Sequence, residues 1–431
     1  MNYYLGIDFG TSGARAIAID QAQTIVAQVK YPFGNLASEN LADIWQRALY
    51  SLLEQIPIEI RKEIRAIAIN GTSSTVLLCD RVGTPLDKPI LYNDNRGVTV
   101  LEQIKEIAPA NHVVISATSS LAKLFWWQQQ TIFSQAAYLL HQADWLGFLL
   151  HGKLGISDYH NALKLGYDVA NFCYPSWLEN LNCRDLLPQI VAPGSAIAQI
   201  QPQISDRFGL PHDCLVRAGT TDSIAAFLAS GANQPGEAVT SVGSTLVLKL
   251  LSTTKVENSS YGIYSHRLGD LWLTGGASNT GGAVLKHFFS DRELVTLSQQ
   301  INPNLASPLE YYPLLSKGDR FPVNDPDLLP QLEPRPDDPV EFLHGLLESI
   351  ARIEALGYQR LQELGASKLT RVYRAGGGAK NTVWNSIAQR LLQVPVIPAK
   401  YAEAAYGTAL ISFGSLDKKS KRESTTCRVS S

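Results

Sequence analysis

Two aspartates in this sequence have neighbours that suit phosphate chemistry. Asp8 follows an apolar run in LGIDFGTSGARAIAID (residues 5–20), and Asp222 follows another in CLVRAGTTDSIAAFLASGA (residues 214–232). A carboxylate at the end of a strand can position a metal or accept a proton from an attacking hydroxyl. The alternative is that each aspartate forms a turn or caps a helix, and a predicted helix does begin at Asp222. Both interpretations remain open at this stage.

A short turn of glycine and hydroxyl residues joins two predicted strands in each half of the chain. The turns contain Gly10, Thr11 and Ser12 in the first half and Gly243, Ser244 and Thr245 in the second. In such a turn the backbone can approach an anion closely, and its N–H groups and hydroxyls act as donors. One such turn is weak evidence and two could be coincidence, but their equivalent places predict that they hold the phosphates of a nucleotide.

A third glycine-rich segment, RAGGGAKNTVW (residues 374–384), lies between a predicted strand and a predicted helix. Its bare backbone could pack against an adenine or a diphosphate, although a tight turn before a helix is an equal alternative. The sequence has no GxxxxGK[ST] motif, and none of its glycine clusters fits the GxGxxG fingerprint. Phosphoryl transfer also requires a divalent cation; Mg²⁺ takes one or two protein carboxylates, so no His/Cys cluster is expected.

Composition narrows the class of protein. The 431 residues exceed one comfortable core, which predicts two domains. A formal net charge of −2 excludes a basic surface for nucleic acid or an anionic membrane, and no apolar run is long enough to span a bilayer. Five dispersed cysteines without metal-ligand spacing predict buried or idle thiols in a reducing compartment. Met1 leads directly into a strand-like run, so we expect a cytoplasmic protein without a signal peptide.

Hydrophobic periodicity and turn residues predict the elements that must position these groups. A hairpin is expected over 3–20, helices over 41–56, 119–130, 135–152 and 339–364, and strand–turn–strand units over 64–80 and 238–251. Strand–loop–helix units are expected over 214–232, 271–289 and 371–396, and proline-rich residues 170–215 predict loops that cross between domains. We therefore expect domains at 1–216 and 217–414, followed by a disordered basic tail at 415–431.

The order of these motifs resembles the FGGY carbohydrate kinases of the actin-like ATPase superfamily, over residues 3 to about 414. DFGTSGAR (8–15) is similar to the family's first phosphate motif, AGTTDSIAAFLASGA (218–232) to the block with the catalytic aspartate, and SVGST (241–245) to the second phosphate turn. Residues 375–396 resemble the adenosine-binding block. The resemblance implies an α/β fold of two actin-like (ribonuclease H-like) domains, with mixed sheets flanked by helices and the active site in the interdomain cleft. The first domain would bind sugar and the second nucleotide.

The resemblance also implies a role for each residue. Asp222 would be the catalytic base. The sugar would be contacted by Asp8, Thr72, Ser73 and Asp222. ATP would be bound by Gly10, Thr11, Ser12, Arg15, Gly243, Ser244, Thr245, Gly376, Gly377, Gly378 and Asn381. Mg²⁺, which accompanies ATP as cofactor, would be held by Asp8 through water.

The choice of sugar depends on the turn in NGTSSTVLLCD (residues 70–80). Glycerol kinases carry an Arg-Glu pair there and xylulokinases a Gln-Met-His run, whereas this chain has Thr72 and Ser73. Small hydroxyl residues are more similar to the D-ribulose kinases of the family, and the compact length resembles their short cyanobacterial and plant types. The implied reaction is ATP-dependent conversion of D-ribulose to D-ribulose 5-phosphate by a monomer or homodimer. The alternatives are a xylulokinase or another sugar or polyol kinase and, in a different class, a non-catalytic ATP- or sugar-binding sensor.

Overall fold

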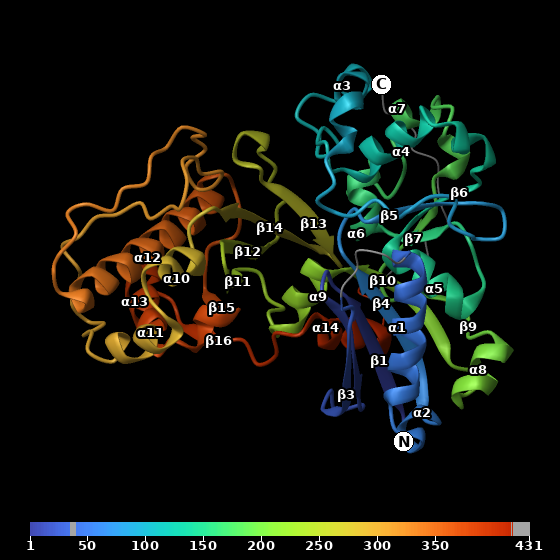
Figure 1. Ribbon diagram of the computed structural model, residues 1–431, viewed down its shortest axis with the longest axis horizontal. Helices are drawn as coiled ribbons and strands as arrows, with labels where there is room; N and C mark the ends of the chain where they lie inside the picture. The colour runs from blue at the N-terminus through green and yellow to red at the C-terminus, as the bar shows by residue number, and fades with distance from the viewer. Residues whose placement is uncertain (35–39, 415, 417–431) are drawn as a thin grey trace. The chain divides into compact units, whose positions relative to one another are not determined.

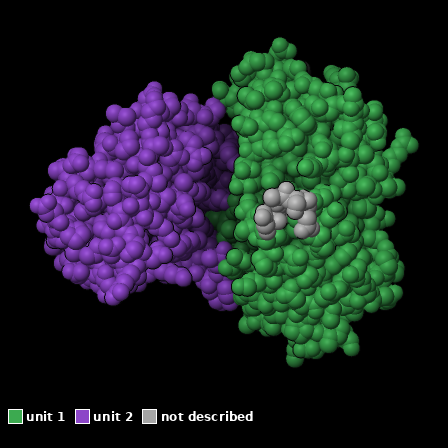
Figure 2. Space-filling model, in the orientation of Figure 1, with its two compact units in different colours: residues 1–229, 403–431 green, residues 230–402 purple. Residues whose placement is uncertain are grey.

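The computed structural model describes residues 1–34, 40–414 and 416. The chain divides into two compact units: unit 1 comprises Met1–Ala229 and Glu403–Ser431, and unit 2 comprises Ser230–Ala402 (Figure 2). Within the described residues, each unit contains a six-stranded mixed sheet with helices packed against it (Figure 1). This architecture confirms the predicted α/β fold with two domains and mixed sheets.

The sheet of unit 1 is built around the predicted N-terminal hairpin. Its strand order is β3-β2-β1-β4-β10-β9. The strands are β1 (Tyr3–Phe9), β2 (Gly13–Ile19), β3 (Ile25–Pro32), β4 (Ile64–Gly71), β9 (Ala196–Gln199) and β10 (Leu215–Thr221). β1 pairs antiparallel with β2 and parallel with β4, and β4 pairs parallel with β10. The parallel strands β1, β4 and β10 therefore end at the same edge of the sheet.

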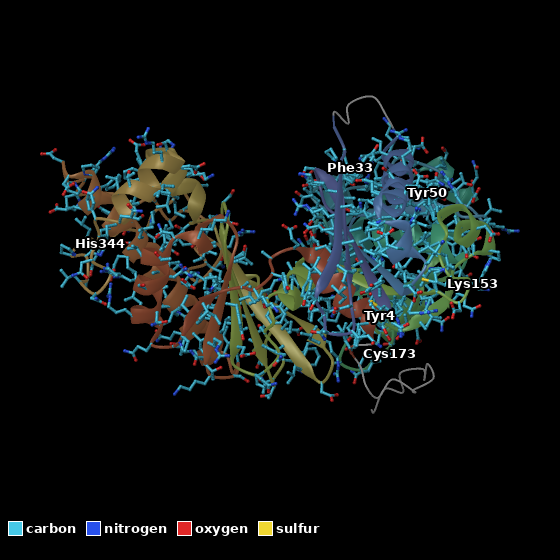
Figure 3. All side chains as sticks on the ribbon, turned by 90° about the horizontal axis from the view of Figure 1, so that it is seen from below. Tyr4, Phe33, Tyr50, Lys153, Cys173 and His344 are labelled. Atoms are coloured by element: carbon cyan, nitrogen blue, oxygen red, sulfur yellow. The ribbon has the colours of Figure 1, made fainter. Side chains whose placement is uncertain are left out.

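The side chains of β1 alternate between two packed faces. Its odd-numbered apolar residues belong to a core shared with α1 (Leu41–Gln55) and α5 (Gln142–His151). On the other face, Gly6 lies against α14 (Ala404–Phe413), where a Cβ on Gly6 would be 2.0 Å from the backbone nitrogen of Ala409. Tyr4, which Figure 3 labels, lies on this same face and contacts Phe413 of α14, with ring centroids 4.6 Å apart. The alternation places Asp8 on the α14 face.

A second hydrophobic cluster of unit 1 surrounds α4. The remaining helices of unit 1, some of which pack elsewhere, are α2 (Ile58–Arg61), α3 (Leu101–Ile107), α4 (Ser120–Gln128), α6 (Tyr159–Ala162), α7 (Ser176–Glu179), α8 (Pro202–Phe208) and α9 (Asp222–Ala229). The short strands pair as β5 (Val76–Cys79) with β6 (Tyr138–His141) and β7 (Ile156–Asp158) with β8 (Gln189–Val191). The 3₁₀ helices span Arg96–Val100, Thr131–Gln135, Leu163–Leu165 and Arg184–Leu186.

Two sequence predictions for unit 1 need correction. Residues 138–141 are a strand because they pair with β5, so the predicted helix over 135–152 shortens to α5, which ends as expected at Gly152 (φ 71°). Residues 170–215 do not cross between the units. They contain β8, β9 and α8 and lead into β10, whose backbone hydrogen bonds are made with β4.

The boundary between the units follows from that pairing. Because β10 and α9 belong to unit 1, the division comes after Ala229 rather than at the predicted 216/217. α14 also belongs to unit 1, since it packs on β1 and α9, although the prediction assigned it to the second domain. Apart from Leu416, the predicted tail at 415–431 lies outside the described residues.

Unit 2 repeats the strand pattern of unit 1. Its sheet has the order β13-β14-β12-β11-β15-β16, in which β11 pairs antiparallel with β12 and parallel with β15. The strands are β11 (Glu237–Val242), β12 (Leu246–Ser252), β13 (Tyr264–Leu268), β14 (Leu271–Ser278), β15 (Arg371–Ala375) and β16 (Val396–Pro398). The helices are α10 (Gly282–Phe288), α11 (Asp291–Ser298), α12 (Pro339–Glu363) and α13 (Thr382–Leu392), with 3₁₀ turns at Ser259–Tyr261 and Gly377–Lys380. In each sheet, therefore, the first strand of a hairpin also pairs in parallel with a later strand, β1 with β4 and β11 with β15.

The structure also tests what the composition predicted about membrane-spanning segments and cysteines. Among the described residues, no helix has the length and apolar character required to cross a bilayer. Cys79, Cys183 and Cys214 are buried free thiols, as predicted. Cys173 is disulfide-bonded, so the prediction of idle thiols is wrong for this residue.

Candidate active site

Unit 1 brings the two predicted carboxylates together at one edge of its sheet. Asp8 on β1 lies opposite Asn70 on β4, and Thr221, which precedes Asp222, lies opposite Gly71. Burial and, to a smaller extent, the negative charge of Asp222 raise the pKa of Asp8 to about 7. The two carboxylates are therefore close enough to repel one another, as expected for groups that share a cation or a polar substrate.

Asn70 lies beside Asp8 on the neighbouring strand. Its fully buried amide favours the ionised form of Asp8 and so lowers the pKa of this carboxyl, which partly offsets the effect of burial. The same amide donates to the hydroxyl of Thr408 on α14, with Nδ2 and Oγ1 2.5 Å apart. Our reading of the sequence missed Asn70, although a polar residue at the end of the apolar run IRAIAIN could have indicated it.

Asp222 is the first residue of α9, as the sequence predicted. Its Oδ1 accepts a hydrogen bond of 2.7 Å from the backbone nitrogen of Ser223. A contact between carboxylate and helix N-terminus suits both interpretations of Asp222, since a capping residue also accepts from the first backbone N–H groups. The two roles can be separated by substitution.

The first predicted phosphate turn joins β1 to β2. The Gly10 nitrogen donates to the Gly13 carbonyl over 3.1 Å, which leaves Thr11 and Ser12 exposed at the tip. Gly13 is required there, because a Cβ would lie 2.7 Å from the carbonyl oxygen of Tyr31 on β3. The tip therefore presents hydroxyls on a tightly held backbone.

Arg15 lies opposite Asp8 on the neighbouring strand β2. Its guanidinium forms an ion pair with Glu403, and the two side chains are 50% and 40% exposed. The positive charge of Arg15 lowers the pKa of Asp8, and the negative charge of Glu403 raises it. Arg15 thus moderates the charge at the carboxylate pair, a contact that its predicted role with ATP did not include.

The turn after β4 holds the two residues assigned to sugar selectivity in different environments. Thr72 is buried, and its hydroxyl is bonded to the hydroxyl of Thr75 (2.5 Å) and to Oε1 of Gln142 (3.2 Å). Ser73 is half-buried. Of the two predicted sugar contacts, Ser73 has the more accessible hydroxyl, and Thr72 shapes the turn.

A fully buried lysine on α4 supports this turn. Nζ of Lys123 donates to the carbonyl oxygens of Ser74 (2.6 Å) and Leu91 (2.7 Å). Ser74 has a positive φ of 65°, a conformation that costs free energy for a residue other than glycine. Burial lowers the pKa of Lys123 to about 7. The lone lysine in SSLAKLFWW could have indicated this support from the sequence.

Unit 2 brings the second predicted phosphate turn together with the triple glycine. Ser244 and Thr245 are exposed between β11 and β12. A Cβ on Gly376 would lie 3.0 Å from the Val242 carbonyl carbon and 3.2 Å from the Gly243 nitrogen, so the two segments touch through their backbones. The accessible backbone of this region suits a flat ring or a phosphate chain.

The structure gives the remaining nucleotide residue, Asn381, a capping role. Its Oδ1 accepts from the Trp384 nitrogen at the start of α13 (3.0 Å), and its Nδ2 donates to the hydroxyl of Ser298 (2.8 Å). Both ends of the amide are therefore engaged within the protein.

The carboxylate pair fits a magnesium ion bound mainly by phosphates and water. Within residues 1–34, 40–414 and 416, no three or more His, Cys, Asp or Glu side chains are grouped to hold a metal. Mg²⁺ needs one or two carboxylates and keeps several waters when it accompanies a nucleotide. A cation near Asp8 and Asp222 would also relieve the repulsion that raises the pKa of Asp8.

Nearly the whole chain is similar in sequence to known proteins. Residues 3–229 match the model of the N-terminal domain of the FGGY family of carbohydrate kinases, and residues 238–415 match that of its C-terminal domain. The chain is 24% identical to a xylulose kinase of Bacillus subtilis, over 96% of this chain and 89% of that protein. It is 22% identical to a gluconokinase of the same species, over 95% and 87% respectively.

Solved structures show the same fold. A ligand-bound xylulose kinase from Lactobacillus acidophilus superposes with a TM-score of 0.80 at 18% identity, over 96% of this chain and 89% of that chain. A glycerol kinase from Plasmodium falciparum with ADP gives the same TM-score, identity and coverage.

Proposed function

The chain belongs to the FGGY family of carbohydrate kinases, and we propose that it is a ketopentose kinase that converts D-ribulose to D-ribulose 5-phosphate with MgATP. The observation that carries the proposal is the pair of carboxylates in unit 1. Asp8 and Asp222 interact strongly enough to affect the pKa of Asp8. Such a pair offers one group to accept a proton and another to orient the substrate.

We assign the proton transfer to Asp222. The terminal hydroxyl oxygen of the sugar attacks the γ-phosphorus of ATP, and its proton passes to the Asp222 carboxylate. The bond between the γ-phosphorus and its bridging oxygen breaks as the new O–P bond forms, and ADP leaves with the electron pair. This is an in-line transfer in which the protein mainly positions the reactants and stabilises charge.

Asp8 and the two turns would stabilise and orient the reacting groups. Asp8 orients the sugar or the waters on the cation, and bound Mg²⁺ neutralises charge on the phosphates. The hydroxyls of Thr11, Ser12, Ser244 and Thr245 are exposed and suited to donate to phosphate oxygens as charge builds there. The triple-glycine segment next to Gly243 would contact the adenosine.

The assignment of D-ribulose rests on the turn after β4. The turn has Thr72 and the half-buried Ser73 at the place where the family resemblance implies an Arg-Glu pair in glycerol kinases and a Gln-Met-His run in xylulokinases. Sites that read hydroxyl groups discriminate strongly, because a mismatched sugar leaves buried polar groups unpaired. D-xylulose is the second candidate, favoured by the names of relatives at 22–24% identity.

A substrate panel tests the proposal. ADP formation would be measured with MgATP and D-ribulose, L-ribulose, D-xylulose, ribitol, glycerol or gluconate, and the phosphorylated product identified by mass. We expect the highest kcat/KM with D-ribulose. A preference for D-xylulose would move the protein to the second candidate, and a preference for glycerol would refute the argument from the turn. No ADP formation with any of these sugars would favour the non-catalytic ATP- or sugar-binding sensor. ADP formation that does not depend on sugar would mean that the protein hydrolyses ATP rather than phosphorylating these sugars.

A further inference from the structure

Unit 2 contains a buried carboxylate that the proposed mechanism does not use. Asp319 is 2% exposed and accepts four hydrogen bonds. Oδ2 accepts from the hydroxyls of Ser278 (2.8 Å) and Tyr312 (2.5 Å). Oδ1 accepts from the backbone nitrogens of Asn279 (2.7 Å) and Arg320 (2.9 Å). Hydrogen bonds to an ionised acceptor are the strong ones, so this carboxylate holds its donors firmly.

Two of these donors belong to the connection between β14 and α10. We call residues 278–282 the loop; they run from the last residue of β14 to the first residue of α10. The loop and the residue after it contact the second phosphate turn through backbone hydrogen bonds. The Gly282 nitrogen donates to the Gly243 carbonyl over 2.8 Å, and the nitrogen of the next residue, Ala283, donates to the Ser244 carbonyl over 3.0 Å. The loop is thus bonded to Asp319 at its start and to the turn at its end.

The backbone of the loop packs so closely on the backbone of the turn that no side chain fits between them. Gly281 has a φ of 145°, and a Cβ there would lie 2.7 Å from the carbonyl carbon of Thr245. A Cβ on Gly282 would lie 2.6 Å from the carbonyl oxygen of Gly243. Because backbone packs directly on backbone, a displacement of the loop must displace the turn.

Further bonds tie the loop to the segment that carries Asp319. Asn279 Nδ2 donates to the Gly318 carbonyl (2.9 Å), and the Thr280 hydroxyl donates to the Pro313 carbonyl (2.7 Å). Residues 312–320 therefore form a support for the loop, in which the Asp319 carboxylate contributes charge.

We propose that Asp319 is a positioning residue for nucleotide binding, which acts through loop 278–282 to orient the turn Gly243–Thr245 toward the ATP phosphates. This inference rests on the proposed function, because it assumes that the turn binds phosphate. Asp319 itself is buried behind the loop and need not touch the nucleotide.

The test is Asp319→Asn, measured by steady-state kinetics and by calorimetric binding of MgADP. The substitution keeps the side-chain volume and removes the negative charge. If the new NH₂ group faces the hydroxyls of Ser278 and Tyr312, these hydroxyls can rotate to accept hydrogen bonds from it. We expect KM for ATP and Kd for ADP to rise about tenfold to a hundredfold, since displacement of positioned groups carries costs of that order. KM for the sugar should remain within about twofold, which a general loss of structure would not allow.

Asp327→Asn is the matched control. Asp327 lies close to Asp319 in sequence, but its side chain is 78% exposed and paired with Lys317 over 2.6 Å. This change should leave both KM values and the ADP affinity unaffected. Equal effects of the two substitutions, or an Asp319→Asn protein with parental ADP affinity, would overturn the proposal.

Tyr312→Phe keeps the inference testable if Asp319→Asn does not fold. It removes one donor from Oδ2 and leaves the carboxylate with three, so it should weaken ADP binding in the same direction but less. Parental ADP affinity in this variant would then count against the proposal. ADP binding does not depend on which sugar is phosphorylated, so an error in the sugar assignment leaves this result intact. A parent protein that binds no nucleotide would refute the proposed function itself.

Discussion

At the scale of single residues, Asp222 can be tested against its interpretation as a helix cap. Asn caps a helix about as well as Asp, so Asp222→Asn should change stability by a few tenths of a kcal/mol if capping is its role. Asn cannot accept the proton of the attacking hydroxyl, and loss of a positioned base costs about 10²–10⁴-fold in rate. We expect kcat to fall at least about a hundredfold while the melting temperature and ADP binding are retained. A variant within about tenfold of the parent would leave Asp222 a cap.

The pKa of Asp8 predicts an effect of pH on stability. Its pKa is about 7 in the folded protein and 3.8 in the unfolded chain, so the folded state holds a proton that the unfolded state releases between these values. Stability from this group is present below pH 3.8 and is lost as the pH rises through 7. Asp8→Asn should therefore melt a few degrees above the parent at pH 8, with a smaller difference at pH 5.

The measurement would be thermal unfolding of both proteins without nucleotide or magnesium, because a bound cation would stabilise the ionised carboxylate. Other groups with shifted pKa values, such as Asp158 and His151, are present in both proteins and cancel in the difference. A difference that does not change with pH would contradict the account of a buried, repelled carboxylate.

At the scale of elements, α14 packs directly on α9, the helix that begins at Asp222. A Cβ on Gly407 of α14 would lie 1.8 Å from the carbonyl oxygen of Ala225 on α9. Gly407→Ala must therefore push α14 away from the helix that begins at Asp222, and we expect a loss of about 1–3 kcal/mol in stability and a lower kcat. Gly414→Ala, at the end of the same helix, is the control, because a Cβ on Gly414 would have no atom of the described residues within 4 Å. Equal stability of the two variants would show that α9 tolerates the shift.

Elements with local signals were predicted correctly from the sequence. The hairpins at Gly10–Gly13 and Gly243–Thr245, the end of α5 at Gly152 and the long helix α12 each depend on nearby turn residues or on apolar periodicity. Residues 138–141 were mistaken for helix because their strand pairing with β5 is set by a segment some sixty residues earlier. Periodicity over four apolar residues cannot distinguish the two states.

Long-range contacts also explain what was missed in the site. Asp8 and Asp222 could be recognised because each follows an apolar strand beside small residues. Asn70, Lys123 and Asp319 act through partners distant in sequence, such as Thr408 on α14 and the loop after β14. Their residue types alone are equally compatible with a solvated surface.

At the scale of the whole molecule, the repeated strand order divides the candidate residues between two units. β1 and β11 each begin a hairpin and pair in parallel with a later strand, so each unit carries one turn with exposed hydroxyls. The carboxylates belong to unit 1 and the triple glycine to unit 2. Composition could not predict the boundary after Ala229, because the pairing of β10 with β4 determines it. It also could not predict that α14, near the end of the chain, packs in unit 1.

The sequence predicts that the two hydroxyl turns hold the phosphates of a single nucleotide, and a double-mutant cycle tests this. Thr11→Val and Thr245→Val each remove a hydroxyl from an exposed turn residue at little change in volume, so folding should be retained. Groups that contact one ligand together are coupled by about 0.5–3 kcal/mol, whereas independent sites add within about 0.3–0.5 kcal/mol. We expect kcat/KM for ATP to fall in each single variant and the double variant to depart from additivity by more than about 0.5 kcal/mol. Strict additivity would mean that the two turns do not act on the same phosphates.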